Sequence, residues 1–155
     1  MTLAQLIFAA LLFIFPNANH RACLNARHDV IVANAEEAAN ANHVPVGVLI
    51  VTGWMESHMG CAPASGGCWG APIDPQHRHT AGTPNHAAVA LATSYRVCHS
   101  WEGAVSRFRC GLCTCRSETH RQYVATSMNL VRRLYIRAGH AEAIPTDLHR
   151  AVTRR

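Results

Sequence analysis

The apolar positions of the chain recur at the three- and four-residue spacing of helices, and no stretch alternates long enough to build a sheet. Local signals for helix ends accompany this pattern: proline at a first helical position, serine as an N-cap and glycine after a last turn. We therefore predict a mainly α-helical chain. The expected helices cover residues 29–42, begin at Pro45 and end before Gly60, begin at Thr83-Pro84, run from Ser100 through Phe108, and run from Ser117 to Gly139.

The helix predicted from Pro45 onward is apolar on almost every face, as expected of a helix at the centre of a domain. Glu56 lies near its C-terminal end, where burying a carboxylate is costly. Burial there and the partial negative charge of a helix C-terminus would both favour the neutral acid, the form that donates a proton. Glu56 is therefore a candidate general acid. The alternative is a glutamate that projects into solvent at a helix end.

An unbroken apolar run of ten residues, from Leu6 to Phe15, lies near the start of the chain and is closed by Pro16. A helix of that length does not cross a bilayer, which needs roughly 20 residues. It fits the core of a signal peptide. We expect residues 1–22 to be a signal peptide, cleaved between Phe15 and Cys23, and the protein to be secreted or periplasmic. The alternative is a buried first helix.

The remaining chain is long enough for one compact domain, which we place at residues 23–138, followed by a polar tail at 139–155 that adds no core. Of the 155 residues, 49% are apolar and 15% are charged, which argues against a disordered chain. The 14 basic residues are all arginine and the formal net charge is +5, so lysine chemistry such as a Schiff base is excluded and an acidic partner is favoured. Because the arginines are mostly scattered, we expect no nucleic-acid partner.

The chain has seven cysteines, an odd number, and an exported protein would hold them mainly as disulfides. Cys61 and Cys68 bracket a short Gly/Pro/Ser loop and form the most natural pair. The second group of candidates for disulfides comprises Cys98, Cys110, Cys113 and Cys115. Cys23 is the expected unpaired thiol, unless it reaches a member of that group.

A zinc site is the alternative use of the second group. Cys110, Cys113 and Cys115 are closely spaced, and His99 and His120 are near them in sequence, so enough ligands for a tetrahedral site are present. Two separated Cys-x2-Cys pairs would be strong evidence for zinc, whereas this chain has one compressed cluster. We therefore expect disulfides, with no metal and no cofactor.

Several blocks of the sequence resemble the transglycosylase (SLT) domain of soluble lytic transglycosylases, which is related to goose-type lysozymes. The family's helix pattern V-x-P-x-L-L-x-A-I-x-x-E-S is matched at Val44-Pro45, Leu49-Ile50 and Glu56-Ser57. Its glycine-rich loop is matched by residues 67–70, its A-x-A-Y-N-x-G block by residues 104–111, and the tyrosine on its closing helix by Tyr123. The resemblance covers roughly residues 25–134.

This resemblance implies a lysozyme-like fold, mainly α with minimal β-structure, as a single compact domain. It implies a monomeric enzyme that binds peptidoglycan glycan strands and cleaves the β-1,4 linkage between N-acetylmuramic acid and N-acetylglucosamine. Glu56 would protonate the leaving oxygen and then act as base on the muramyl 6-hydroxyl, giving a 1,6-anhydro product. The candidate substrate-binding residues are Ser57, Trp69, Gly70, Tyr95, Phe108, Arg109 and Tyr123.

The chain departs from the family pattern at two places near the expected site. Pro72-Ile73 stands where the family has Met-Gln, and Phe108-Arg109 stands where it has Tyr-Asn. Asp74 is the carboxylate of the long loop that could serve as the second acid of a hydrolase, although the Asp-Pro sequence there favours a turn. Two alternatives to the enzyme remain: a non-catalytic glycan-binding protein of the same fold, and a small disulfide-rich or zinc-binding structural protein.

Overall fold

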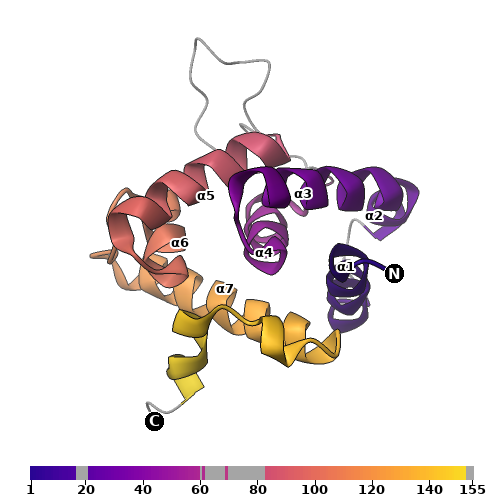
Figure 1. Cartoon of the computed structure of the whole chain (residues 1–155). Coiled ribbons are helices and arrows are strands. Elements are labelled where there is room, and N and C mark those ends of the chain that lie inside the picture. The colour runs from indigo at the N-terminus through magenta and orange to yellow at the C-terminus, as the bar shows by residue number, and fades with distance from the viewer. Residues whose placement is uncertain (17–20, 60, 62–68, 70–82, 153–155) are drawn as a thin grey trace.

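The computed structural model of the chain is built of helices (Figure 1). It describes residues 1–16, 21–59, 61, 69 and 83–152. No strand occurs among these residues, so the prediction of a mainly α-helical chain is confirmed, while the lysozyme-like fold with minimal β-structure stays a prediction. The elements are α1 (Leu3–Ile14), α2 (Arg21–Ala26), α3 (His28–Asn42), α4 (Val46–Ser57), α5 (Pro84–Cys98), α6 (Trp101–Cys110), α7 (Glu118–Arg137) and the short 3-10 helices η2 (Ala141–Ala143) and η3 (Thr146–Val152).

Three of the helices predicted from the sequence begin at the side-chain caps that it indicated. The side chains of Thr83, Ser100 and Ser117 each accept a hydrogen bond from a backbone N–H in the first turn of α5, α6 and α7, respectively. These caps satisfy donors that have no partner within a helix. α6 ends at Gly111, whose positive φ of 80° suits a residue without a Cβ. The predicted starts of these three helices are confirmed.

α4 lies at the centre of the molecule, with α1, α3, α5 and α7 packed around it (Figure 1). Every residue from Gly47 through Trp54 is buried. Near its N-terminal end, the backbone N–H of Gly47 donates to the Tyr135 hydroxyl of α7 at 3.2 Å, and a Cβ at Gly47 would overlap that ring. The predicted central position of this apolar helix is therefore confirmed.

α1 packs against α3, α4 and α7, and its Ile7, Phe8 and Leu11 side chains are fully buried. At its C-terminal end, the Arg21 guanidinium donates to the carbonyl oxygen of Leu12. In the whole chain this segment therefore forms a buried first helix, while the expected cleavage of residues 1–22 stays a prediction. None of the helices in the described part of the chain is long and apolar enough to cross a membrane.

The C-terminal segment contributes to the core, which corrects the expectation that residues 139–155 add none. Ile144 and Leu148 are buried, with 7% and 1% of their surface exposed. The Asp147 carboxylate accepts a 2.6 Å hydrogen bond from the backbone N–H of Trp101 at the start of α6. Arg132 of α7 donates to the Leu148 carbonyl. Ile144 and Leu148 therefore anchor this otherwise polar segment in the core, and its polar groups form hydrogen bonds with α6 and α7.

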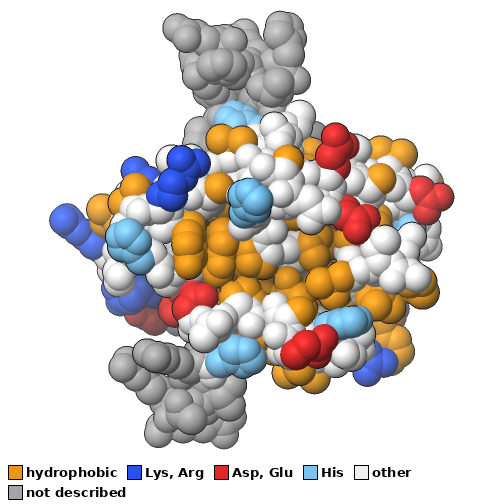
Figure 2. Space-filling model, in the orientation of Figure 1, with side chains coloured by type: hydrophobic (Ala, Val, Ile, Leu, Met, Phe, Trp, Pro, Cys, Tyr) orange, Lys and Arg blue, Asp and Glu red, His pale blue; other side chains and the backbone are white. Residues whose placement is uncertain are grey.

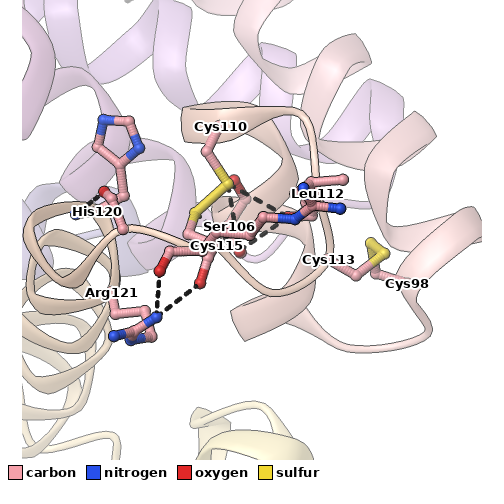
Figure 3. The surroundings of a disulfide bond; sticks show 10 residues. Cys98, Ser106, Cys110, Leu112, Cys113, Cys115, His120 and Arg121 are labelled. Atoms are coloured by element: carbon pink, nitrogen blue, oxygen red, sulfur yellow. Dashed lines mark hydrogen bonds between the residues drawn. A yellow bond between two sulfur atoms is a disulfide. The ribbon is translucent and has the colours of Figure 1, made fainter.

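The described residues form three disulfides, which are Cys23–Cys61, Cys98–Cys113 and Cys110–Cys115. The last two pair members of the expected second group (Figure 3). Cys98–Cys113 joins the end of α5 to the loop after α6, and Cys110–Cys115 joins the end of α6 to the same loop. The expected pairing of Cys61 with Cys68 is wrong, and so is the expectation that Cys23 is unpaired. The fold brings Cys23 of α2 next to Cys61, just beyond the end of α4. Cys68 lies outside the described residues.

The disulfide between Cys110 and Cys115 lies beside His120, and the ligand atoms of these three residues are within 4.8 Å of one another. Figure 3 shows Ser106 next to this disulfide, with its hydroxyl 3.2 Å from the Cys115 sulfur. Arg121 donates to backbone carbonyls of the same loop, including that of Cys115. Zinc binds thiolates, and these sulfur atoms are bonded to each other. The expectation that these cysteines form disulfides is therefore confirmed, and the structure adds their pairing, which the sequence did not predict.

Candidate active site

Three segments that are distant in sequence meet at the C-terminal end of α4, where they form what we term the Glu56 cluster: Glu56, Arg109 and Tyr123. Glu56 lies in the last turn of α4, Arg109 in the last turn of α6, and Tyr123 in the N-terminal part of α7. The Tyr123 hydroxyl donates to Glu56 Oε1 at 2.6 Å, and a guanidinium nitrogen of Arg109 lies 3.6 Å from the same oxygen. The Glu56 side chain is 15% exposed and that of Arg109 is 35% exposed. The cluster is thus a largely buried carboxylate with one hydrogen-bond donor and one cation.

The backbone at the end of α4 determines the position of Glu56. His58 and Met59 have positive φ angles of 47° and 53°, so the helix ends abruptly. Their N–H groups donate back to the carbonyls of Trp54 and Gly53, and the Met59 side chain is fully buried. Left-handed backbone is unfavourable for residues with a Cβ, and the burial of Met59 offsets that cost. The last turn of α4 is therefore held by its own backbone bonds and by the core.

A stack of rings supports the same turn. The Trp54 ring lies against His58 with the ring centroids 4.1 Å apart. Phe15, just after α1, also stacks on the Trp54 ring, with a centroid distance of 5.0 Å. The disulfide from Cys23 to Cys61 ties α2 to the chain immediately after this turn. The end of α4 is thus linked to the N-terminal helices by both ring packing and a covalent bond.

Tyr123 acts as a hydrogen-bond donor in this cluster. Burial raises the pKa of its hydroxyl far above the ordinary value, and the hydrogen bond to the Glu56 carboxylate and the charge of that carboxylate act in the same direction. The Arg109 cation lowers the pKa and is the smallest of these effects. Tyr123 therefore keeps its proton throughout the physiological range. Among the described residues it is the one that donates a hydrogen bond to Glu56.

Four of the predicted site residues lie in or next to the Glu56 cluster. Arg109 and Tyr123 contact Glu56 directly. Ser57 follows Glu56 in the last turn of α4 and is 3% exposed. Phe108 precedes Arg109 in α6 and is partly buried against the core. Of this group, Arg109 has the side chain most clearly accessible to a ligand, because a third of it is exposed.

Trp69 packs on α4 and is only 4% exposed, which leaves little of its ring for a sugar to stack on. A Cβ at Gly53 would overlap the Trp69 indole. Gly53 precedes Glu56 by one helical turn and shares its side of the helix, so Trp69 packs on the side of α4 that carries the carboxylate. Gly70, and Asp74 as the candidate second acid, lie outside the described residues.

Tyr95 lies at the other end of α4. Its ring stacks on Trp101 with the centroids 4.2 Å apart, and it lines a hollow together with Pro45, the residue before α4. The rise of a helix from Pro45 to Glu56 is about 16 Å. Tyr95 therefore does not belong to the Glu56 cluster. The hollow that it lines is seen in Figure 2, where hydrophobic side chains gather across the middle of the molecule, between α5 and the C-terminal 3-10 helices.

Arg109 and Tyr123, which the resemblance gives as sugar contacts, contact each other and Glu56 in the structure. The Arg109 guanidinium carbon lies 4.3 Å from the centroid of the Tyr123 ring. No local pattern predicts this meeting, because it depends on how α7 packs against both α4 and α6. A signal for the Trp69 contact did exist: glycine is unfavourable inside a helix, and Gly53 within an apolar helix indicates a close approach of another group.

Comparison of the chain with family models, with curated proteins and with solved structures gave no match. The class that the geometry defines is a disulfide-stapled helical protein with a largely buried glutamate at the end of its central helix. A function is therefore proposed from the Glu56 cluster and from the sequence blocks that contribute to it.

Proposed function

We propose that the protein is a lytic transglycosylase that cleaves peptidoglycan with Glu56 as its single acid/base. The observation that carries this proposal is the hydrogen bond between Glu56 and Tyr123, 67 residues apart, with Arg109 beside it. These residues come from separate sequence blocks that resemble one family of enzymes. Blocks that share a catalytic role are expected to surround one site, and the meeting of Glu56 and Tyr123, which match the family pattern, supports the resemblance. Arg109 lies in a matching block at a position where the family has asparagine.

In the proposed reaction Glu56 donates a proton to the glycosidic oxygen while the bond between N-acetylmuramic acid and N-acetylglucosamine breaks. The resulting carboxylate accepts the proton of the muramyl 6-hydroxyl, whose oxygen bonds to C1 of the same sugar. The product is a 1,6-anhydro sugar and no water is consumed. Because Tyr123 donates to Oε1, Oε2 is the oxygen left to exchange protons in both steps.

A single carboxylate suffices for this reaction, whereas most glycoside hydrolases use two. Among the described residues, no second carboxylate forms a hydrogen bond or ion pair with the Glu56 cluster. The disulfides suit an oxidising compartment outside the cytoplasm, and the formal charge of +5 favours binding to acidic wall polymers. Both features support export to the place where peptidoglycan occurs.

The test is digestion of purified peptidoglycan by the full chain, with separation of the soluble products by mass. We expect 1,6-anhydro ends from the wild type and none from Glu56→Gln, which keeps the side-chain size and an acceptor for Tyr123 but removes the exchangeable proton. Reducing ends in place of anhydro ends would make the enzyme a hydrolase. Equal product from both proteins would refute the role of Glu56.

Glu102→Gln provides a matched control because Glu102 is an acidic residue in the first turn of α6, outside the Glu56 cluster. We expect this variant to retain wild-type cleavage. Binding of peptidoglycan without cleavage, by the wild type and Glu56→Gln alike, would favour the non-catalytic glycan-binding protein. If the wild type neither binds nor cleaves peptidoglycan, that result would favour a disulfide-rich structural protein.

A further inference from the structure

We propose that Arg109 binds a carboxylate of the glycan strand next to the bond cleaved with Glu56, which makes the site selective for muramyl-containing strands over neutral ones. This inference rests on the proposed function and names the substrate group recognised at that site. Two carboxylate sources exist in such strands. One is the lactyl group of a muramyl sugar that carries no peptide, and the other is the stem peptide.

The first reason is that Arg109 has hydrogen-bond donors available. A guanidinium carries five N–H donors in a planar fork. The nearest acceptor, Glu56 Oε1, is 3.6 Å from the guanidinium nitrogen, beyond the roughly 2.7–3.2 Å of an N–H···O hydrogen bond. Within the described part of the chain, no residue accepts a hydrogen bond from this side chain. A 35% exposed cation with these donors can bind an anionic group.

The second reason is that the guanidinium is held in place before a ligand arrives. It lies over the Tyr123 ring at 4.3 Å, a cation–π contact, and the hydroxyl of that ring is bonded to Glu56. A contact of this kind occupies a flat face of the guanidinium and uses none of its N–H donors. Arginine binds a carboxylate along its N–H edge with two parallel hydrogen bonds. Holding the side chain in advance lowers the entropy lost on binding.

The third reason is the electrostatics of the cluster. A substrate carboxylate close to Glu56 would be repelled whenever Glu56 is ionised, before it takes up the proton that it donates and after the donation, and the Arg109 cation beside Oε1 offsets that repulsion. A neutral chitin-type strand has no charge for the guanidinium. Arg109 would then lose water on binding without gaining an ionic partner. The site is therefore expected to distinguish the two kinds of strand.

The experiment measures binding by full-length Glu56→Gln, so that the ligand is not consumed. The probes are a peptide-free tetrasaccharide of alternating N-acetylglucosamine and N-acetylmuramic acid, the same tetrasaccharide with stem peptides, and chitotetraose. We expect at least one muramyl probe to bind about tenfold or more tightly than chitotetraose. Adding Arg109→Gln should remove this preference, and adding Arg109→Lys, which keeps the charge but not the fork, should retain part of it.

Arg107→Gln is the matched control because it removes the same charge from the same last turn of α6, outside the Glu56 cluster. It should leave the preference unchanged. The muramyl probe that loses affinity in Arg109→Gln identifies the carboxylate source as lactyl or peptide. If Glu56→Gln does not fold, the wild type is titrated with N-acetylmuramic acid and N-acetylglucosamine by NMR, since neither monosaccharide has a bond to cleave.

The inference is overturned if the parent shows no preference for a muramyl probe, or if Arg109→Gln keeps that preference. Failure of the proposed function gives a different result: the wild type leaves peptidoglycan intact although Arg109-dependent binding persists. Cleavage by the wild type without any Arg109-dependent preference refutes the role of Arg109 and leaves that of Glu56 standing.

Discussion

The Tyr123 hydroxyl donates a 2.6 Å hydrogen bond to Glu56 Oε1 and joins α7 to the end of the central helix α4. The same ring lies under the Arg109 guanidinium of α6, so one tyrosine connects three helices at the site. Because the pKa of Tyr123 is raised, its hydroxyl keeps its proton and acts only as a donor to the Glu56 carboxylate.

We expect Tyr123→Phe to slow peptidoglycan cleavage by about tenfold or more, because Glu56 loses its donor while the ring beneath Arg109 remains. The rate is measured from the appearance of 1,6-anhydro ends. A hydrogen bond to a charged group contributes about 1.5–3 kcal/mol, so the free energy of unfolding should also fall by an amount of that order.

Tyr135→Phe separates the effect on rate from the effect on stability. The Tyr135 hydroxyl accepts a hydrogen bond from the Gly47 N–H near the other end of α4. Its loss should cost about 0.5–1.5 kcal/mol of unfolding free energy and leave the cleavage rate of the folded protein unchanged. Equal slowing in the two variants would show that the rate follows stability rather than the bond to Glu56.

Stability should decrease in alkaline solution. Burial raises the pKa values of both Tyr123 and Tyr135 in the folded protein, whereas in the unfolded chain both ionise near the ordinary value of about 10. Above about pH 10 the unfolded state releases protons that the folded state retains, so the free energy of unfolding falls as pH rises. Urea unfolding from neutral to alkaline pH measures this. The double variant with phenylalanine at both positions should show a weaker dependence, and an equally steep one would contradict the assignment.

Gly53→Ala tests the packing of Trp69 on α4. Alanine is normally better than glycine inside a helix by about 1 kcal/mol, but a Cβ here would overlap the indole. We therefore expect a net loss of about 1–3 kcal/mol in unfolding free energy. In the Trp69→Ala background the same change should no longer be destabilising, because the overlap is gone. A stabilising effect of Gly53→Ala in the wild type would show that Trp69 does not pack there.

The disulfides should differ in their contributions to stability. Cys23 and Cys61 are separated by 38 positions, and loop-closure entropy predicts a stabilisation of about 4 kcal/mol for such a loop. Cys110 and Cys115 are separated by 5 positions, for which the same relation predicts about 2 kcal/mol. Paired serine substitutions followed by urea unfolding would measure each contribution. Peptide mapping without reductant should recover Cys23 bonded to Cys61, and recovery of Cys61 bonded to Cys68 would contradict the structure.

Helix ends could be predicted from the sequence because their causes are local. Ser100 and Ser117 cap α6 and α7 through hydrogen bonds that span three residues, and Gly111 ends α6 through its own backbone conformation. The central place of α4 was also predictable, since a helix that is apolar on almost every face must be surrounded. The candidate role of Glu56 followed from its position near the end of that helix.

The tertiary structure alone decided which distant residues meet. Cys23 pairs with Cys61 because α2 lies beside the end of α4, and nearness in sequence had favoured Cys68 instead. Ile144 and Leu148 join the core, and between them Asp147 accepts a hydrogen bond from the Trp101 N–H at the start of α6, a contact across 46 positions. Tyr123 reaches Glu56 because α7 packs against α4, and Arg109 reaches it because α6 packs against α7. Spacing along the chain encodes the ends and faces of helices, whereas contacts between helices depend on how those faces pack together.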